Sequence, residues 1–370
     1  MKQNLNTRLY SLDALRGFDM LFIMGFSGFV IALCGLSDSA FAGWLADQMR
    51  HVEWNGLAHH DTIFPLFLFV AGVSFPFSLA AQRAKSLSSG QIHRKILTRA
   101  LTLIALGVVY NGLFKLDFEN LRIASVLGRI GIAWAVAALL YIHCGVKTRV
   151  AVAATILLGY WGLSMIVAPD AVAGADSLSK DGCLVGYIDR LLLPGKLIYG
   201  NFDPEGLLST LPAVVTAMLG NFAGEWVRQP EQKVSGNRKA AMMAAAGVVM
   251  AVVAWAWNFV LPINKMLWSS SFVLAVGSYS LLMFALFYYI IDVRGWKRWT
   301  LFFRVIGLNS ITIYLAQKII DFKRVARFFL GGVADMCPED WSKVILTGGY
   351  VLACWLMLYF LYKKDTFLKV

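Results

Sequence analysis

The stretch that decides the fold runs from residue 62 to residue 82 and reads TIFPLFLFVAGVSFPFSLAAQ. It contains no Asp, Glu, Lys or Arg, and its apolar residues follow one another without the alternation of a half-buried strand. A run of about 20 such residues is long enough to cross the hydrocarbon core of a bilayer as a helix. We therefore predict a transmembrane helix here.

The composition extends this prediction to the whole chain. Apolar residues make up 58% of the 370 residues, charged residues make up 15%, and the mean hydropathy is +0.64. A soluble fold has too little interior for so much apolar surface, and continuous apolar runs exclude an outer-membrane barrel. We expect one all-α polytopic domain over residues 1–370, a bundle of about ten transmembrane helices. The predicted spans are 18–36, 62–82, 96–114, 123–143, 149–168, 206–227, 240–261, 268–291, 300–320 and 342–362.

The net charge of +12 is carried by short basic clusters between the apolar runs. No nucleic-acid-binding motif accompanies them, so we expect no nucleic acid as a partner. The clusters favour alternate loops, and the positive-inside rule then predicts both termini in the cytoplasm (N-in/C-in). Three long loops, 37–61, 169–205 and 321–341, would lie on the opposite face. Within the third, residues 322–333 mix basic and aromatic side chains, as an interfacial helix does.

The densest polar cluster lies at the outer mouth of the second predicted span. It consists of His51, Glu53, Trp54, Asn55, His59, His60 and Asp61. Histidines beside a carboxylate at a membrane boundary suggest proton transfer, because imidazole titrates near neutral pH. The alternative is an ordinary wet loop whose histidines hydrogen-bond locally. No HExxH motif or cysteine partner supports a metal site, so we expect no metal.

Several polar residues fall inside or beside the predicted spans, where they are costly and tend to be functional. They are Arg16, Arg99, Arg129, Arg304 and Asn309. Arg16, Arg99 and Arg304 either reach the cytoplasmic headgroups with their charged ends, or such arginines bind an anionic cofactor from that side. Asn264 and Lys265 occupy a short turn between two spans, and the DPEG stretch at 203–206 fits a helix start. Cys183 and Cys337 fall in outer loops, and the sequence leaves open whether they pair.

Seven motifs, in order along nearly the whole chain, carry a resemblance to a known family. They are SLDALRG at 11–17, HVEWNGL at 51–57 with DTIFP at 61–65, RIASVLGRIG at 122–131, GYIDRL at 186–191, DPEG at 203–206, PINKMLWS at 262–269 and NS at 309–310. The chain resembles the transmembrane heparan-alpha-glucosaminide N-acetyltransferase family, which includes bacterial members. Only the membrane core of that family is matched, and Ser27 stands where the animal enzyme has an asparagine in its first span.

The resemblance implies a reaction and a site. Acetyl would pass from cytoplasmic acetyl-CoA, the co-substrate, to the amine of glucosamine or of a terminal glucosamine on the periplasmic side. His51, in the HxxWNG motif, would be catalytic, and we expect it to act as the general base. We expect Asp61 or Glu53 to orient its imidazole, and Asn55 or Asn264 to stabilise the oxyanion. A route through acetyl-His51 is the alternative.

The remaining expected contacts divide between acceptor and donor. For the acceptor they are Glu53, Trp54, Asp203, Glu205, Lys265, Asn309 and Ser27. For the phosphates of acetyl-CoA they are Arg16, Arg99, Arg129 and Arg304. A donor that enters from the cytoplasm and reacts near the outer face requires a polar tunnel between the helices.

Two other functions stay open. One is an O-acyltransferase that acts on surface or periplasmic glycans, and the other is a proton-coupled amino-sugar transporter. The lack of an internal repeat argues against the transporter. We expect a multi-pass protein of the bacterial inner membrane, with an amino-sugar acceptor and the lipid bilayer as partners. The sequence leaves open a homodimer.

Overall fold

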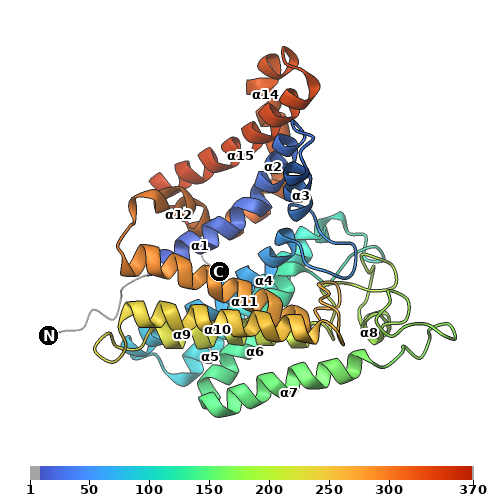
Figure 1. The fold of residues 1–370 in the computed structure, drawn as a ribbon, viewed down its shortest axis with the longest axis vertical. Coiled ribbons are helices and arrows are strands. Elements are labelled where there is room, and N and C mark those ends of the chain that lie inside the picture. The colour runs from blue at the N-terminus through green and yellow to red at the C-terminus, as the bar shows by residue number, and fades with distance from the viewer. Residues whose placement is uncertain (1–8, 369–370) are drawn as a thin grey trace.

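A computed structural model describes residues 9–368, and within that range the protein is all-helical, with only two isolated β-bridges. The long helices lie side by side, while the loops around the short helix α8 gather at one end of the bundle (Figure 1). The helices of the first half are α1 Tyr10–Leu21, α2 Ser27–Cys34, α3 Ala40–Gln48, α4 His59–Ala84, α5 Ser89–Tyr110, α6 Val126–His143, α7 Val146–Ser164 and α8 Leu184–Leu192. Those of the second half are α9 Thr210–Val227, α10 Gly236–Trp257, α11 Ser270–Phe287, α12 Leu301–Leu308, α13 Ser310–Ile319, α14 Phe322–Asp335 and α15 Glu339–Lys363.

The number of helices able to cross a membrane is smaller than the sequence predicted. Among the described residues six are long and apolar enough: Tyr10–Cys34, His59–Ala84, Val126–His143, Gly236–Trp257, Ser270–Val293 and Glu339–Lys363. A seventh is formed if Arg298–Leu308 and Ser310–Ile319, bent by 56° at Asn309, count as one span. A multi-pass membrane protein is therefore supported, but the predicted count of ten is not.

The shortfall has a physical cause in three helices. Each of α5, α7 and α9 covers a predicted span, but each is less apolar than a span requires. Basic residues occupy the first half of α5 and the first turn of α7, while α9 has only 18 residues and carries Asn221 and Glu225. Six spans would place the two termini on the same side of the membrane and seven would place them on opposite sides, and the helices alone do not decide between these counts. The structure therefore does not support the expected N-in/C-in arrangement either.

Helix α4 is the centre of the bundle and packs against α1, α6, α9 and α11. Its contact with α9 is close because small residues face each other. A Cβ atom added to Gly72 would lie 2.1 Å from the carbonyl oxygen of Ala217, and one added to Gly220 would lie 2.1 Å from that of Phe69. Small residues allow such close backbone approach between membrane helices. This packing fixes the helix whose first turn carries His59, His60 and Asp61.

The first span is broken in its middle. Residues Phe22–Phe26 form a π-helical turn between α1 and α2, and Gly25 within it has a φ of 105°. A side chain there would be strained by this backbone conformation, and its Cβ would lie 2.6 Å from the ring of Tyr350. Such π-bulges are frequent at functional sites, and Ser27 is the first residue after this one.

Two other features of the outer loops can be compared with the predictions. Residues 322–333 are helical, as predicted, within α14, which leaves Phe328 and Phe329 exposed beside its basic residues. Its contact with a membrane surface stays a prediction. All five cysteines are free, so Cys183 and Cys337 do not pair.

Candidate active site

His51, Asp61 and Lys265 form the centre of the site. Nδ1 of His51 lies 2.7 Å from Oδ1 of Asp61, and Nζ of Lys265 lies 3.2 Å from the same oxygen and 2.9 Å from Nδ1 of His51. The Asp61 side chain is 0% exposed, that of Lys265 is 13% exposed and that of His51 is 48% exposed. A buried carboxylate therefore lies beneath a half-exposed imidazole.

The contacts determine which nitrogen of His51 is free. A carboxylate accepts hydrogen bonds, so the short contact with Asp61 requires a proton on Nδ1. The Lys265 ammonium then donates to Asp61 rather than to Nδ1. Nε2 of a neutral His51 is left with its lone pair. This is the arrangement of the histidine–aspartate pair in hydrolytic triads, where the carboxylate fixes the tautomer and the far nitrogen acts as the base.

The Asp61 carboxylate is held from both sides. Its Oδ2 accepts from the backbone N–H groups of Val52, at 3.3 Å, and Ala58, at 3.2 Å. Asp61 lies in the first turn of α4, where the free N–H groups and the helix dipole favour a negative charge. Burial lowers the pKa of Lys265, an effect that the charges of Asp61 and Glu205 oppose. The local sequence thus stabilises a carboxylate at the start of α4, and Lys265, distant in the chain, neutralises it.

The turn at residues 262–269 holds the HxxWNG turn in position. The Gly56 N–H donates to the Ile263 carbonyl at 2.8 Å, and Asn264 Nδ2 donates to Asn55 Oδ1 at 2.9 Å. The other end of the Asn264 amide accepts from the Leu267 N–H at 2.9 Å. Gly56 has a φ of 121°, which an L-residue with a side chain rarely adopts. The HxxWNG turn is therefore fastened to the 262–269 turn, which carries Lys265.

His60 belongs to the site, although the sequence did not single it out from the histidine cluster. Its ring centroid lies 4.4 Å from that of His51, and its Nδ1 lies 3.0 Å from Oγ of Ser27. Ser27 is therefore linked to His51 through one intervening imidazole. The signal in the sequence is the helix start at His59, which makes His60 and Asp61 successive residues of one turn.

His59 has a different environment. Its Nε2 lies 3.0 Å from the hydroxyl of Tyr279, its backbone N–H donates to Gln48, and its ring packs edge-on against Phe22 at 4.6 Å. These contacts tie the start of α4 to three other segments. They make His59 a residue that holds the site in place.

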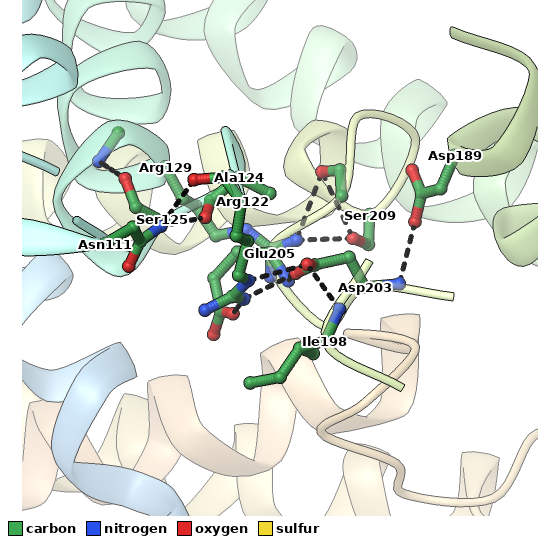
Figure 2. A network of polar contacts seen from close by, with 12 residues as sticks. Asn111, Arg122, Ala124, Ser125, Arg129, Asp189, Ile198, Asp203, Glu205 and Ser209 are labelled. Atoms are coloured by element: carbon green, nitrogen blue, oxygen red, sulfur yellow. Dashed lines mark hydrogen bonds and ion pairs between the residues drawn. The ribbon is translucent and has the colours of Figure 1, made fainter. Parts of the chain in front are cut away.

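Figure 2 shows a second polar network, in which Arg122 fastens the DPEG stretch. Arg122 Nε and Nη2 donate to the two carboxylate oxygens of Asp203 at 2.7 and 2.6 Å, and Nη2 also contacts Glu205. Burial acts to lower the pKa of Arg122, but Asp203 and Glu205 together raise it above its ordinary value. Burial likewise acts to raise the pKa of Asp203, but Arg122 holds it below its ordinary value. Both acidic residues are thus held by an arginine.

Asp189 belongs to the same network and holds the backbone of the DPEG stretch. Its carboxylate accepts from the backbone N–H groups of Leu207 at 2.9 Å and Asp203 at 3.3 Å. Burial raises its pKa to about 6, although these two hydrogen bonds act in the opposite direction. Gly206 lies against it, since a Cβ atom there would be 2.0 Å from Oδ2 of Asp189. The GYIDRL and DPEG motifs are therefore parts of one loop anchor.

Arg129 lies in this network and not with the other candidate phosphate ligands. Its Nη2 donates to the Gly206 carbonyl at 3.2 Å and contacts Ser209, while its guanidinium lies 4.9 Å from the ring of Trp268. It is 2% exposed. Its Nε and Nη1 atoms are buried without a hydrogen-bond partner among the described residues, so its role as a phosphate ligand of the donor stays a prediction.

Two predicted acceptor contacts, Trp54 and Asn309, bond to other parts of the protein, and a third, Glu53, has no partner among the described residues. Trp54 Nε1 donates to the Leu178 carbonyl at 2.9 Å, and its ring packs against Phe202. Asn309 lies at the break between α12 and α13, where its Nδ2 donates to the Thr366 carbonyl at 3.2 Å. Glu53 is exposed and makes no ion pair or hydrogen bond with any of residues 9–368. Asp61, rather than Glu53, is therefore the partner of His51.

Arg16, Arg99 and Arg304 lie deeper along the bundle than His51. Arg16 Nη2 donates to Ser74 at 3.1 Å, and Ser74 lies 13 residues after Asp61 on α4, roughly 20 Å along the helix. Arg99 lies 4.3 Å from the ring of Trp134 and Arg304 lies 4.1 Å from that of Tyr10. The Nε atoms of Arg99 and Arg304 are buried without a hydrogen-bond partner among the described residues. Such unsatisfied cationic donors suit an anionic group.

A small cavity of about 40 Å³ lies between the His51 site and the deeper arginines. It is lined by Met20, Ile23, Phe64, Phe67, Val126, Leu127, Ile130, Ser310, Ile311 and Tyr314. Phe64 follows Asp61 by one turn, and Met20 follows Arg16 by one turn. The lining is mainly apolar, and the expected polar tunnel stays a prediction. A cavity of this size holds only water-sized molecules, so passage of a longer group requires side chains to move.

The fold and the site together define a multi-pass membrane protein with a histidine–aspartate pair at the start of its central helix, α4. No group of three or more His, Cys, Asp or Glu side chains within residues 9–368 is arranged to hold a metal ion. A histidine–aspartate pair of this kind is able to carry a proton to and from a bound substrate.

Comparisons with known proteins agree with this class. No family model matches the sequence. The chain is similar to heparan-alpha-glucosaminide N-acetyltransferase of Homo sapiens, 26% identical over 98% of this chain and 60% of the human protein. It is equally similar to the protein of that name from Mus musculus, 26% identical over 87% of this chain and 56% of the mouse protein. The chain thus spans little more than half the length of either relative. These matches confirm the family resemblance that the motifs predicted and support an acyltransferase enzyme.

Proposed function

We propose that the protein is an N-acetyltransferase that moves acetyl from acetyl-CoA to the amine of glucosamine or of a terminal glucosamine of an oligosaccharide. The observation that carries this proposal is the 2.7 Å contact between His51 and buried Asp61, which leaves Nε2 of a half-exposed histidine free. The similarity to enzymes named for this reaction supports the choice of substrates.

The chemistry follows from the state of the amine. At neutral pH a sugar amine is largely ammonium, which has no lone pair with which to attack a thioester. Nε2 of His51 accepts a proton from it, and the amine nitrogen then attacks the acetyl carbonyl carbon. The C–N bond forms, the C–S bond breaks, and the electron pair leaves with the CoA sulfur, which takes up the second proton that the nitrogen loses as it becomes an amide. Asp61 stabilises the imidazolium formed on His51.

Lys265 has a role separate from that of His51. Lys265 neutralises the buried carboxylate of Asp61. Asp61 can therefore accept the hydrogen bond from Nδ1 of His51 without being an unpaired buried charge. We expect the developing oxyanion to accept a hydrogen bond from Asn55, whose Nδ2 makes no hydrogen bond within the described residues. Asn264 is committed to Asn55 and Leu267, and we now assign it to positioning.

The donor end is assigned to the deeper arginines. Arg16, Arg99 and Arg304 would bind the phosphates of acetyl-CoA, and the unpartnered Nε atoms of Arg99 and Arg304 fit that role. The donor would then enter from the cytoplasm while the acceptor reaches His51 from the periplasmic side. A location in the bacterial inner membrane completes this proposal.

The test is transfer of radiolabelled acetyl from acetyl-CoA to glucosamine by the full chain in detergent. The proposal predicts labelled N-acetylglucosamine, formed only with acetyl-CoA present. Label on a hydroxyl of a glycan instead would assign the protein to O-acyl transfer. No label on any acceptor, together with proton-dependent amino-sugar uptake by vesicles, would assign it to transport.

A further inference from the structure

A second pair of histidines lies outside the proposed active site. His93 is on α5, five residues after the Ser88 cap, and His143 is the last residue of α6. Their Nε2 atoms are 2.8 Å apart and their ring centroids are 5.0 Å apart. The two nitrogens therefore face each other across the contact between two packed helices.

One of the two imidazoles is already in the tautomer that a metal requires. Nδ1 of His93 lies 2.7 Å from the backbone carbonyl oxygen of Ser89. A carbonyl only accepts, so Nδ1 carries the proton and Nε2 of a neutral His93 presents its lone pair to His143. A carbonyl that holds the N–H of a histidine in this way is the usual outer partner of a metal-binding imidazole.

We propose that His93 and His143 bind one divalent transition-metal ion of the zinc class between their Nε2 atoms, with water completing the coordination. Two nitrogens at about 2.0–2.1 Å from a tetrahedral ion lie roughly 3.3 Å apart. The observed separation of 2.8 Å is within a small side-chain movement of that value. His143 holds its proton on Nδ1 when its Nε2 binds the ion.

The electrostatic surroundings have one favourable and one opposing part. His143 ends α6, so the negative end of that helix dipole lies beside the ion. Arg94 and Lys95 follow His93, but both side chains are exposed and their charges are screened by solvent. Nε2 of His93 directs its lone pair at Nε2 of His143, and an ion between the two nitrogens would replace the hydrogen bond that now joins the rings.

The site is remote from His51. Helix α4 runs from His59 for 26 residues, roughly 39 Å, before a short turn leads into α5. His93 and His143 lie at that far end of the bundle. A bound ion would join α5 to α6 there, six residues before Arg99 on α5, and its binding does not depend on the proposed reaction.

The experiment is calorimetric titration of Zn²⁺ into the full chain, purified in detergent, freed of its affinity tag and treated with a chelator. We expect one ion per chain, with at least tenfold weaker binding in His93→Gln and in His143→Gln. His51→Gln is the matched control. The chain has five histidines, and the three besides His93 and His143 are His51, His59 and His60 at the other site, so this variant should bind Zn²⁺ as the wild type does.

Thermal unfolding separates a loss of metal binding from a loss of folding. Thermal unfolding without metal should be nearly the same for wild type, His93→Gln and His143→Gln, and added Zn²⁺ should raise the melting temperature of wild type only. Absence of Zn²⁺ binding by the wild type would overturn the proposal. So would unchanged binding in His93→Gln, or binding that is lost in His51→Gln alone.

Discussion

Nδ1 of His51 lies 2.7 Å from a carboxylate oxygen of Asp61, and the Asp61 side chain is completely buried beneath it. Ten residues separate the two in the chain, and a helix start lies between them. This relationship assigns separate tasks to the two nitrogens of His51. Nδ1 is held by Asp61, and Nε2 of this half-exposed side chain is the nitrogen to which we assign proton transfer in the proposed reaction.

The first prediction concerns Asp61→Asn. An amide at this position removes the negative charge that stabilises imidazolium and no longer selects the productive tautomer of His51. We expect kcat to fall by about 10²- to 10⁴-fold, the usual size of a general-base contribution. Steady-state kinetics on the monodisperse variant, with Arg50→Gln as a neighbouring exposed control, measures this. Unchanged kcat in Asp61→Asn would remove Asp61 from the mechanism.

The second prediction concerns the alkaline side of the pH profile. Burial lowers the pKa of Lys265, so the ammonium that neutralises Asp61 is lost at a lower pH than in an exposed lysine. Activity should therefore decline as pH rises through this lowered pKa. Arginine stays protonated, and Lys265→Arg should move the decline to higher pH even if its maximal rate is lower. Superimposable alkaline limbs for the two proteins would contradict the role of Lys265.

The third prediction separates donor binding from chemistry. Removal of a phosphate ligand in Arg99→Gln or Arg304→Gln should raise KM for acetyl-CoA about tenfold or more, since a charge-assisted hydrogen bond contributes about 1.5–3 kcal/mol. The KM for the sugar should not change. Arg94→Gln, an exposed position on the same helix as Arg99, is the matched control. An equal rise in all three variants would point to a general effect of net charge.

The fourth prediction concerns stability and Asp189. Burial raises the folded-state pKa of Asp189 to about 6, above the unfolded value of about 3.9. Between these values the folded protein holds a proton that the unfolded chain has lost, so this residue makes stability fall as pH rises. In Asp189→Asn this component should disappear. Melting temperatures of both proteins from pH 4 to pH 7 measure it, and parallel curves would show that Asp189 does not titrate as inferred.

The sequence predicted much of this site because its chemistry is local. His51, Asn55 and Asp61 lie within ten residues of one another, and the helix start that follows makes Asp61 a first-turn residue. The pairing of Asp61 with His51 could be proposed from that spacing, but the choice between Asp61 and Glu53 required the fold. Glu53 points to solvent, whereas Asp61 is held by two backbone N–H groups.

What the sequence could not predict depends on distant contacts. Lys265 is 204 residues from Asp61 in the chain, and nothing in a short polar turn reveals which carboxylate it neutralises. Arg129 was grouped with the other arginines because it lies in a span, but the partner that encloses it comes from the DPEG loop. The number of spans was overestimated because apolar runs near 20 residues were counted without weighing the charges in α5 and α7.

The most direct test of the central claim is acetyl transfer from acetyl-CoA to glucosamine by wild type beside His51→Ala, with Arg50→Gln as the folded neighbour control. The account predicts that wild type and Arg50→Gln form N-acetylglucosamine and that His51→Ala, with an unchanged melting temperature, does not. Product formation by His51→Ala at the wild-type rate would contradict the assignment of His51 as the base.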